Sequence, residues 1–484
     1  MKYSDAIKQK YGKEGRLNDY LSVEGEFLSY KNIKLCGLVA KYGAPLEVGY
    51  TEIINERINS LKENFRVAAK KFGYTGKYIY AYASKANYYS EVLATALDTV
   101  DALEVTSSYD LDIVEYLFKA KLLTKDIPII CNGFKYDRYL EKIFSLREQG
   151  FNLQPVLENE QELNTLLLRK DLSFNVGLRL NLDNDLLSGE MDSERAGSDI
   201  DSRFGFFFED MRRCAEKVRS SEHLTLKIFH FHFGGTIQDL GAYRSLVEDI
   251  YRDNYCELKR ANPSLEFFDV GGGLPVQYDL GSEFDYQKYA DTLVETVVKV
   301  SDKAGVSPAN IIGECGRYTV NDYGFFCFKI AMTKKTKEKD TFWYFINGSL
   351  MNFLPDAWAL GQNFIILPLN GWGREAVKVR LGGITCDPDD TYYKHEKDNF
   401  IYLPATKDGE DLYIGIFGVG AYQEMISGVG GVHHCLLPEG NELVIYRKDG
   451  KLQFDKITPL QAPEKVLKIL DYHGMHAIQR YKGN

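Results

Sequence analysis

Short apolar runs alternate with amphipathic segments along the whole stretch from residue 78 to residue 314. The apolar runs have the length and composition of buried strands, and they lie at 78–83, 102–105, 127–131, 153–157, 174–180, 225–232, 266–270 and 311–314. Helical spacing predicts helices between them, at 88–98, 108–121, 136–149, 159–169, 205–219, 242–260 and 285–304. Strands that alternate with helices on this scale form parallel βαβ units. The strand count predicts an α/β fold built on a TIM-type (β/α) barrel, with an open doubly wound sheet as the alternative.

The chain has 484 residues, which is too many for one ordinary core, so more than one domain is expected. An amphipathic helix at Thr51–Gly73 precedes the first barrel strand. After about residue 320 the pattern changes to strand-like runs between turns, at 342–346, 376–380, 412–417 and 443–446, with a final helix near 463–470. We expect residues 1–47 to add strands to this β-rich domain, residues 48–320 to form the barrel, and residues 321–484 to form the second domain.

Two shorter regions carry predictions of their own. Tyr20–Val23 and Leu35–Val39 are the candidates for N-terminal strands. Asn181–Ser202 is rich in Asp, Ser and Gly without periodicity, which predicts a long surface loop near the mouth of the barrel. The sequence leaves open whether this loop acts as a lid.

Charge and cysteine content exclude several classes of function. The net charge of −10 argues against a nucleic-acid partner. No apolar run is long enough to cross a membrane, and Met1–Asp5 is not followed by the apolar core of a signal peptide. The eight cysteines form no CxxC pair, so neither a zinc site nor a disulfide framework is predicted. We therefore expect a soluble enzyme of a reducing, cytoplasmic compartment.

Lys85 follows the first barrel strand directly, in the segment Tyr78–Asn87. A lysine at the end of a buried strand is partly desolvated, which disfavours its charged form and makes the amine a usable nucleophile. The alternative is a lysine whose charged end simply reaches solvent.

Other chemically capable residues occupy the corresponding positions on later strands. They are Glu104, Arg179, His232, Gly271, Gly272, Gly273, Glu314, Gly316 and Arg317. The carboxyl ends of barrel strands form the catalytic face of such a fold. Glycine backbone can approach a phosphate closely, and a carboxylate can bond a pyridine nitrogen. Each residue also has an ordinary alternative, such as a turn glycine, a core histidine or a salt bridge, but together they fit a phosphorylated aromatic cofactor.

The motifs that carry these residues resemble those of the fold-type III pyridoxal-phosphate decarboxylases, which act on ornithine, diaminopimelate and arginine. The matching stretches are 83–87, 232–235, 271–273, 314–317, 386–389 and 420–422. Within this group, the stretches 130–135, 354–358, 384–387 and 419–424 are most similar to biosynthetic arginine decarboxylases. The chain departs from those enzymes in lacking their inserted helical bundle. It also has Gly235 where many members have serine, and Cys315 where ornithine-type members have proline.

The resemblance implies a role for each matching residue. Lys85 would hold pyridoxal 5'-phosphate covalently, Glu314 would bond the ring nitrogen, and His232 would stack on the ring. The phosphate would be held by Gly235, Gly271, Gly272, Gly273, Gly316, Arg317 and Tyr422, with Glu104 and Arg179 close to the cofactor. Cys386 would act as the general acid from the partner subunit, so a homodimer with shared active sites is implied, and higher oligomers are left open.

The same resemblance implies decarboxylation of a small-molecule amino acid. Asp356 and Asp387 match positions where relatives place acids against the distal group of the substrate. Met351–Asp356 lacks the arginine that diaminopimelate enzymes use, which favours a basic amino acid. We expect L-arginine, giving agmatine for polyamine synthesis. Ornithine, lysine or a carboxy-polyamine are alternatives; diaminopimelate, a racemase and a non-catalytic regulatory homologue are less favoured. No motif supports a requirement for Mg²⁺.

Overall fold

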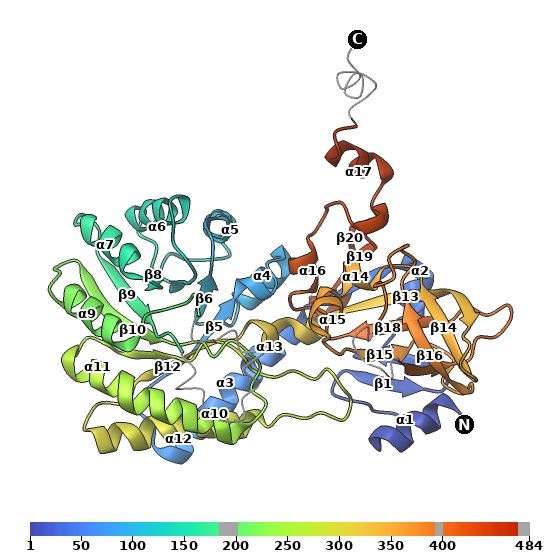
Figure 1. Ribbon diagram of the computed structural model, residues 1–484, viewed down its shortest axis with the longest axis horizontal. Helices are drawn as coiled ribbons and strands as arrows, with labels where there is room; N and C mark the ends of the chain where they lie inside the picture. Colours follow the sequence, from blue (N-terminus) through green and yellow to red (C-terminus); the bar gives the residue numbers. More distant parts are fainter. Residues whose placement is uncertain (183–201, 393–399, 473–484) are drawn as a thin grey trace, which may run out of the picture. The chain divides into compact units, whose positions relative to one another are not determined.

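The computed structural model describes residues 1–182, 202–392 and 400–472 (Figure 1). The chain divides into two compact units. The barrel unit comprises Ile53–Val276 and Phe284–Val320. The sheet unit comprises Met1–Glu52, Gln277–Glu283 and Asn321–Asn484.

The barrel unit is built on a closed barrel of eight parallel strands, as the alternation of apolar runs predicts. In chain order the strands are β5 (Tyr78–Ala83), β6 (Ala102–Val105), β7 (Ile129–Cys131), β8 (Leu153–Leu157), β9 (Phe174–Arg179), β10 (Leu224–His230), β11 (Phe267–Asp269) and β12 (Asn310–Glu314). Pairing of β12 with β5 closes the barrel, with Glu314 opposite Ala81. The TIM-type prediction is therefore confirmed, and the open doubly wound sheet is excluded.

Small and branched apolar side chains form a buried cluster on the barrel strands. Its members come from six strands and are Ala81, Ala102, Ile130, Val156, Ile228 and Ile312. A barrel packed in this way is a core and not a pore, so chemistry is confined to the strand ends.

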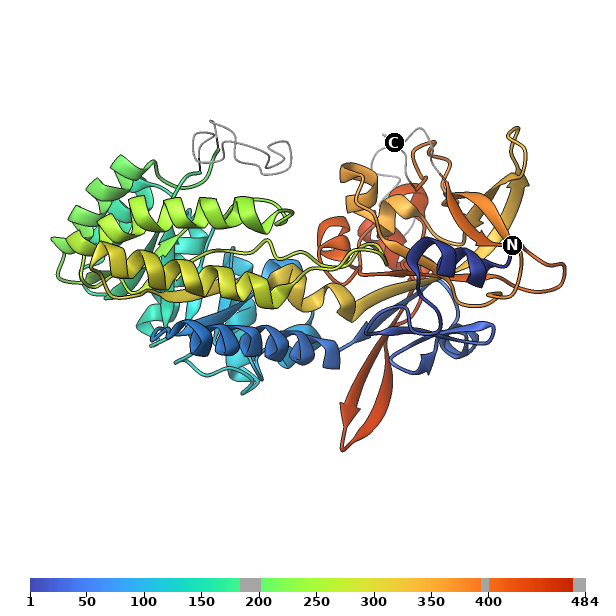
Figure 2. The same cartoon turned by 90° about the horizontal axis from the view of Figure 1, so that it is seen from below.

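Helices cover the outside of the barrel. They are α3 (Glu52–Phe72), α4 (Ser90–Ala96), α5 (Ser108–Lys119), α6 (Arg138–Glu148), α7 (Glu160–Leu168), α9 (Phe208–Arg219), α10 (Leu240–Asp249), α11 (Cys256–Ala261), α12 (Tyr286–Ala304) and α13 (Gly316–Val320). Figure 2 shows α10 and α12 running side by side. The predicted single helix at 242–260 contains a π-helical turn, η2 (Ile250–Tyr255), between α10 and α11.

The sheet unit contains a nine-stranded mixed sheet. Its strands are β4 (Leu46–Tyr50), β13 (Gly324–Lys335), β14 (Thr341–Ile346), β15 (Ile365–Pro368), β16 (Ala376–Gly382), β17 (Ile401–Pro404), β18 (Tyr413–Phe417), β19 (Asn441–Lys448) and β20 (Lys451–Thr458). β4 pairs with β13 on one side and β19 on the other, so an N-terminal strand joins the C-terminal sheet as expected. The β19–β20 hairpin projects from the sheet (Figure 2).

The other elements of the sheet unit are short. They are α1 (Tyr3–Tyr11), α2 (Leu35–Tyr42), η3 (Asn321–Tyr323), α14 (Leu350–Phe353), α15 (Pro355–Leu360), α16 (Gln423–Ser427), η4 (His434–Leu436), α17 (Pro463–Ile469) and a separate sheet of β1 (Leu21–Glu24), β2 (Phe27–Tyr30) and β3 (Ile33–Lys34).

The prediction of a strand at Leu35–Val39 is wrong, because this segment begins helix α2. Its buried residues Leu35, Leu38 and Val39 recur at helical spacing and form one face. A short apolar run fits a buried strand and a buried helix equally well, so the sequence pattern alone does not distinguish them. The predicted strand at Tyr20–Val23 corresponds to β1, which lies in the three-stranded sheet.

Most of the predicted loop Asn181–Ser202 lies outside the described residues, so its role stays a prediction. Among the helices that are described, none has both the length and the apolar character that crossing a membrane requires.

Candidate functional site

Lys85 lies where β5 ends, in a single 3₁₀ turn, η1 (Ser84–Ala86). Its Nζ is 3.3 Å from Oε1 of Glu104, which ends β6. Glu104 is fully buried, whereas 38% of the Lys85 side chain is exposed. The amine therefore sits at the rim of the barrel core with a carboxylate beneath it.

Asn132 extends this contact across the barrel. It follows β7, and its Nδ2 donates to Oε1 of Glu104 at 3.0 Å and to Oε1 of Glu314 at 2.6 Å. Lys85, Glu104, Asn132 and Glu314 thus form a continuous row of polar side chains at the carboxyl ends of β5, β6, β7 and β12. The sequence analysis assigned no role to Asn132, although its place after a strand was a usable signal.

His230 and Asp269 lie behind Glu314, and both are buried. Nε2 of His230 is 3.7 Å from Oε2 of Glu314. Oδ1 of Asp269 accepts the N–H of Gly271 at 2.9 Å, while Oδ2 has no hydrogen-bond partner among the described residues. Ligand atoms of His230, Asp269 and Glu314 lie within 4.8 Å of one another, so the group could hold a metal ion or share protons.

Burial and mutual repulsion separate the acids of this region. Burial raises the pKa of Glu104 to about 7 although Lys85 opposes the shift. Burial, and then repulsion from Glu314, hold the pKa of Asp269 well above its usual range. Burial opposes ionisation of Glu314, but attraction to His230 and Lys85 brings its pKa below the usual range. Glu314 is therefore the carboxyl group of this cluster that stays ionised at neutral pH.

Two loops of small residues face each other beside Glu314. Gly271 has φ +64° and Gly273 has φ +102°, which side chains rarely adopt. A Cβ on Gly272 would lie 2.9 Å from the backbone oxygen of Glu314. A Cβ on Gly271 would lie 2.7 Å from Cδ2 of His232, whose Nδ1 accepts an N–H from its own loop. The backbone of the 271–273 loop therefore lies closer to Glu314 and His232 than a residue with a side chain would permit.

Gly273 and Gly316 allow two more close approaches. A Cβ on Gly273 would lie 2.9 Å from the oxygen of Gly235, and a Cβ on Gly316 would lie 2.9 Å from Cβ of Ala86. Gly316 begins α13, so the start of this helix packs directly on the turn that carries Lys85. Arg317, the next residue of α13, is half-buried.

Arg179 ends β9 and makes an ion pair within the barrel. Its Nη1 is 2.8 Å from Oε1 of the buried Glu158, which the sequence analysis did not single out. Its guanidinium lies 4.4 Å from the ring centre of Phe204. Arg179 thus makes two contacts within the protein, an ion pair with Glu158 and a cation–π contact with Phe204.

The remaining predicted residues belong to the sheet unit. Asp356 is buried on α15, and its Oδ2 accepts from Nε2 of Gln423 at 2.9 Å. Tyr422 precedes α16 with φ +70°, an uncommon backbone conformation for a bulky residue.

Cys386 and Asp387 lie in the loop after β16. Cys386 is exposed, and its Sγ is 3.4 Å from Sγ of Cys435. Oδ2 of Asp387 is 3.5 Å from Nε2 of His434. The predicted residues therefore form two groups, a larger one in the barrel unit and a smaller one in the sheet unit.

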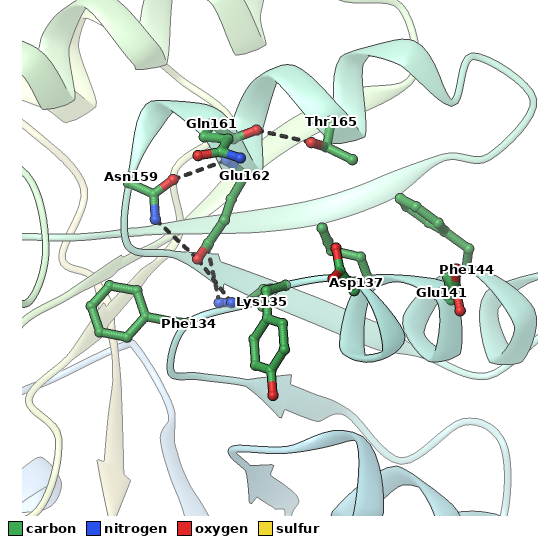
Figure 3. Close-up of a pocket in the computed structure, with 11 residues that line it drawn as sticks. Phe134, Lys135, Asp137, Glu141, Phe144, Asn159, Gln161, Glu162 and Thr165 are labelled. Carbon is green, nitrogen blue, oxygen red and sulfur yellow. Dashed lines mark hydrogen bonds and ion pairs between the residues drawn. The ribbon is translucent and has the colours of Figure 1, made fainter.

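A cavity of about 440 Å³ lies elsewhere on the barrel unit, between the start of α6 and the start of α7 (Figure 3). None of the predicted site residues lines it. Nζ of Lys135 is 3.3 Å from Oε2 of Glu162 and donates to the oxygen of Gly133 at 2.7 Å and to that of Val156. Asn159 Nδ2 donates to Glu162 as well. Because these polar groups satisfy one another, we interpret the cluster as a structural brace.

A known family model matches residues 58–321. The matching model is described as the pyridoxal-dependent decarboxylase, pyridoxal binding domain.

Curated relatives cover nearly the whole chain. The biosynthetic arginine decarboxylase of Geobacter sp. (strain M21) is 24% identical, over 92% of this chain and 86% of that protein. The enzyme of the same name from Phocaeicola vulgatus is 24% identical, over 89% of this chain and 83% of that protein.

Solved structures share the fold. The biosynthetic arginine decarboxylase from Campylobacter jejuni aligns with a TM-score of 0.80 and 21% identity, covering 100% of this chain and 94% of that chain. A diaminopimelate decarboxylase from M. jannaschii, in complex with L-lysine, aligns with a TM-score of 0.77 and 20% identity, covering 95% and 99%.

Proposed function

This chain belongs to the pyridoxal-dependent decarboxylase family, and from that membership we propose that it converts L-arginine to agmatine and carbon dioxide. The observation that carries the proposal is the row of side chains from Lys85 through Glu104 and Asn132 to Glu314. It places an amine and an ionised carboxylate at the same end of one barrel, which is what a pyridoxal cofactor needs from its protein. The expected setting is cytoplasmic polyamine synthesis.

The barrel residues fit such a cofactor in two respects. A Cβ on Gly271 would meet His232, one on Gly272 would meet Glu314, and one on Gly273 would meet Gly235. Because glycine has no Cβ, the N–H groups of this loop can approach a phosphate. Oε2 of Glu104 is buried and has no hydrogen-bond partner within the described part of the chain. We propose that the three glycines, with Gly235, Gly316, Arg317 and Tyr422, hold the phosphate.

Each side chain at this end of the barrel would have its own role around the cofactor ring. Nζ of Lys85 would join the aldehyde carbon, and the ring would lie against His232. Burial lowers the pKa of His232 to about 3, so this imidazole is neutral and can stack without adding charge. The carboxylate of Glu314 would accept a hydrogen bond from the protonated ring nitrogen, and Asn132 would orient that carboxylate. When bound, pyridoxal phosphate supplies an electron-accepting ring for the charge left by departing carbon dioxide.

Residues of the sheet unit would protonate the substrate carbon and recognise the distal group of the substrate. We propose that Sγ of Cys386 delivers a proton to the substrate carbon as general acid. Asp356 and Asp387 would accept hydrogen bonds from the distal guanidinium, because a guanidinium forms charge-assisted hydrogen bonds with carboxylates. Met351–Asp356 offers no arginine for a distal carboxylate, which argues against diaminopimelate.

Product analysis with four substrates tests this proposal. Holoenzyme is supplied separately with L-arginine, L-ornithine, L-lysine and meso-diaminopimelate, and carbon dioxide and the amine product are measured. We expect kcat/KM for arginine to exceed the others by at least about tenfold, a discrimination of about 1.4 kcal/mol.

The other possible outcomes would change either the proposed substrate or the proposed activity. Preference for ornithine or lysine would replace the substrate while keeping the reaction. Cofactor binding without release of carbon dioxide from any of the four substrates, or from a carboxy-polyamine supplied as a fifth, would favour a regulatory homologue. The Lys85→Ala variant serves as the control for background decarboxylation.

A further inference from the structure

Cys386 and Cys435 are the two exposed cysteines of the eight, and the others are buried or half-buried. They stand 49 positions apart in the sequence, yet their Sγ atoms are 3.4 Å apart. We propose that this pair is a redox modification site, at which exchange with a small-molecule disulfide closes a reversible Cys386–Cys435 bond within one chain.

The loop that carries Cys386 is fixed by the buried Asp390. Oδ1 of Asp390 accepts from Oγ of Ser349 at 3.1 Å, and its Oδ2 accepts from Oγ1 of Thr385 at 2.8 Å. Thr385 immediately precedes Cys386, so the thiol is attached to backbone held from two directions. Its nearness to Cys435 is therefore a property of the fold and not of a freely moving loop.

The segment that carries Cys435 is held against the same loop. Nε2 of His434 is 3.5 Å from Oδ2 of Asp387, so the two segments meet at consecutive positions on each side. The oxygen of His434 accepts from Nδ2 of Asn352 at 3.3 Å. Cys435 itself has φ +56°, a conformation that a non-glycine residue keeps only when its surroundings impose it. A shift of little more than 1 Å would bring the sulfur atoms to the bonding distance of about 2.05 Å.

The chemistry balances with an external disulfide such as oxidised glutathione. One protein thiolate attacks the glutathione disulfide, which forms a mixed disulfide and releases one glutathione thiolate. The second protein thiolate attacks the protein sulfur of that mixed disulfide and releases the second glutathione. The two protein thiols are oxidised by two electrons, the external disulfide is reduced by two, and the two thiol protons end on the released glutathiones.

The functional consequence rests on the proposed function. If Cys386 is the general acid, its sulfur cannot deliver a proton while it is bonded to Cys435. Decarboxylation would then stop in oxidising conditions and resume after reduction. Exposure of both sulfurs gives the small-molecule reactant access.

Holoenzyme equilibrated in glutathione redox buffers provides the test. We expect a non-reduced digest to contain a peptide linking residues 386 and 435, with two free thiols lost per chain. Arginine turnover should fall by more than about tenfold and return with dithiothreitol. Cys435→Ser should keep its activity in the oxidising buffer, whereas the matched control Cys36→Ser, at a half-buried cysteine, should be inactivated like the wild type.

Three results would overturn the proposal. They are mixed glutathione disulfides without the linked peptide, a bond between two chains, and equal inactivation of Cys435→Ser. A linked peptide in a protein that decarboxylates no substrate would leave the thiol site standing and would instead remove the proposed function.

Discussion

Three buried carboxyl groups, those of Glu104, Asp269 and Glu314, share one small region at the end of the barrel. Like charges this close cannot all ionise, so their surroundings decide which one does. His230 and Lys85 favour the charged form of Glu314, whereas burial keeps the pKa of the other two high. Protonation states at this end of the barrel are therefore a property of the cluster and of no single residue.

The raised pKa of Glu104 makes a prediction about stability. A carboxyl group whose pKa is higher when folded stabilises the fold at low pH, and that contribution is lost as pH rises from about 4.5 to about 7. Relative to Glu104→Gln, the cofactor-free wild type should lose on the order of 3 kcal/mol between pH 4.5 and pH 7.5. Urea unfolding at the two pH values measures this difference.

The matched control is Glu216→Gln, the same substitution at an exposed position on α9. A Glu104→Gln protein whose stability tracks the wild type at both pH values would contradict the account.

The loop of Gly271, Gly272 and Gly273 leads to a second prediction. In Gly272→Ala the new Cβ would meet the oxygen of Glu314, so the loop must leave the position that we propose holds the phosphate. We expect the dissociation constant for pyridoxal phosphate to rise at least about tenfold, a loss of about 1.4 kcal/mol. Gly37→Ala, where a Cβ meets nothing within 4 Å, is the control. Equal cofactor affinity in the two variants, measured by titration of the apoprotein, would remove the glycine loop from the site.

At the scale of elements, the barrel strands were predictable because short, mainly apolar runs recur between segments with helical spacing. β4 was not predicted, because Glu47 and Gly49 interrupt its run of apolar residues. Its partner strands β13 and β19 also lie nearly 300 and 400 positions further along the chain. Asn132, His230 and Asp269 escaped for a related reason. They act on Glu314, and only the closed register of the barrel brings their strands together.

Close packing between β13 and the loop after β18 gives a prediction for the sheet unit. A Cβ on Gly324 would lie 2.6 Å from Cα of Gly420, two positions before Tyr422. Because the clash is with backbone, Gly324→Ala should lower the free energy of unfolding by about 1–3 kcal/mol. Chemical denaturation followed by circular dichroism measures the loss, and Gly37→Ala again serves as the control. Unchanged stability would mean that these two segments do not meet as described.

At the scale of the whole molecule, the homodimer with shared sites that the family resemblance implies leads to a quantitative prediction. Lys85→Ala and Cys386→Ala should each be inactive alone. If every site takes Lys85 from one chain and Cys386 from the other, a mixed dimer has one intact site and one doubly defective site. Mixing the variants with subunit exchange should therefore restore about a quarter of wild-type activity. No recovery, in mixtures where native mass spectrometry detects the mixed dimer, would contradict shared sites.

The central claim is that Lys85 is the amine that joins the cofactor at the end of this barrel. Borohydride reduction of the native holoenzyme, followed by peptide mapping, tests it most directly. We expect one phosphopyridoxyl group per chain, on the peptide that contains Lys85. A reduced protein without that group, or with it on another lysine such as the buried Lys135, would contradict the account.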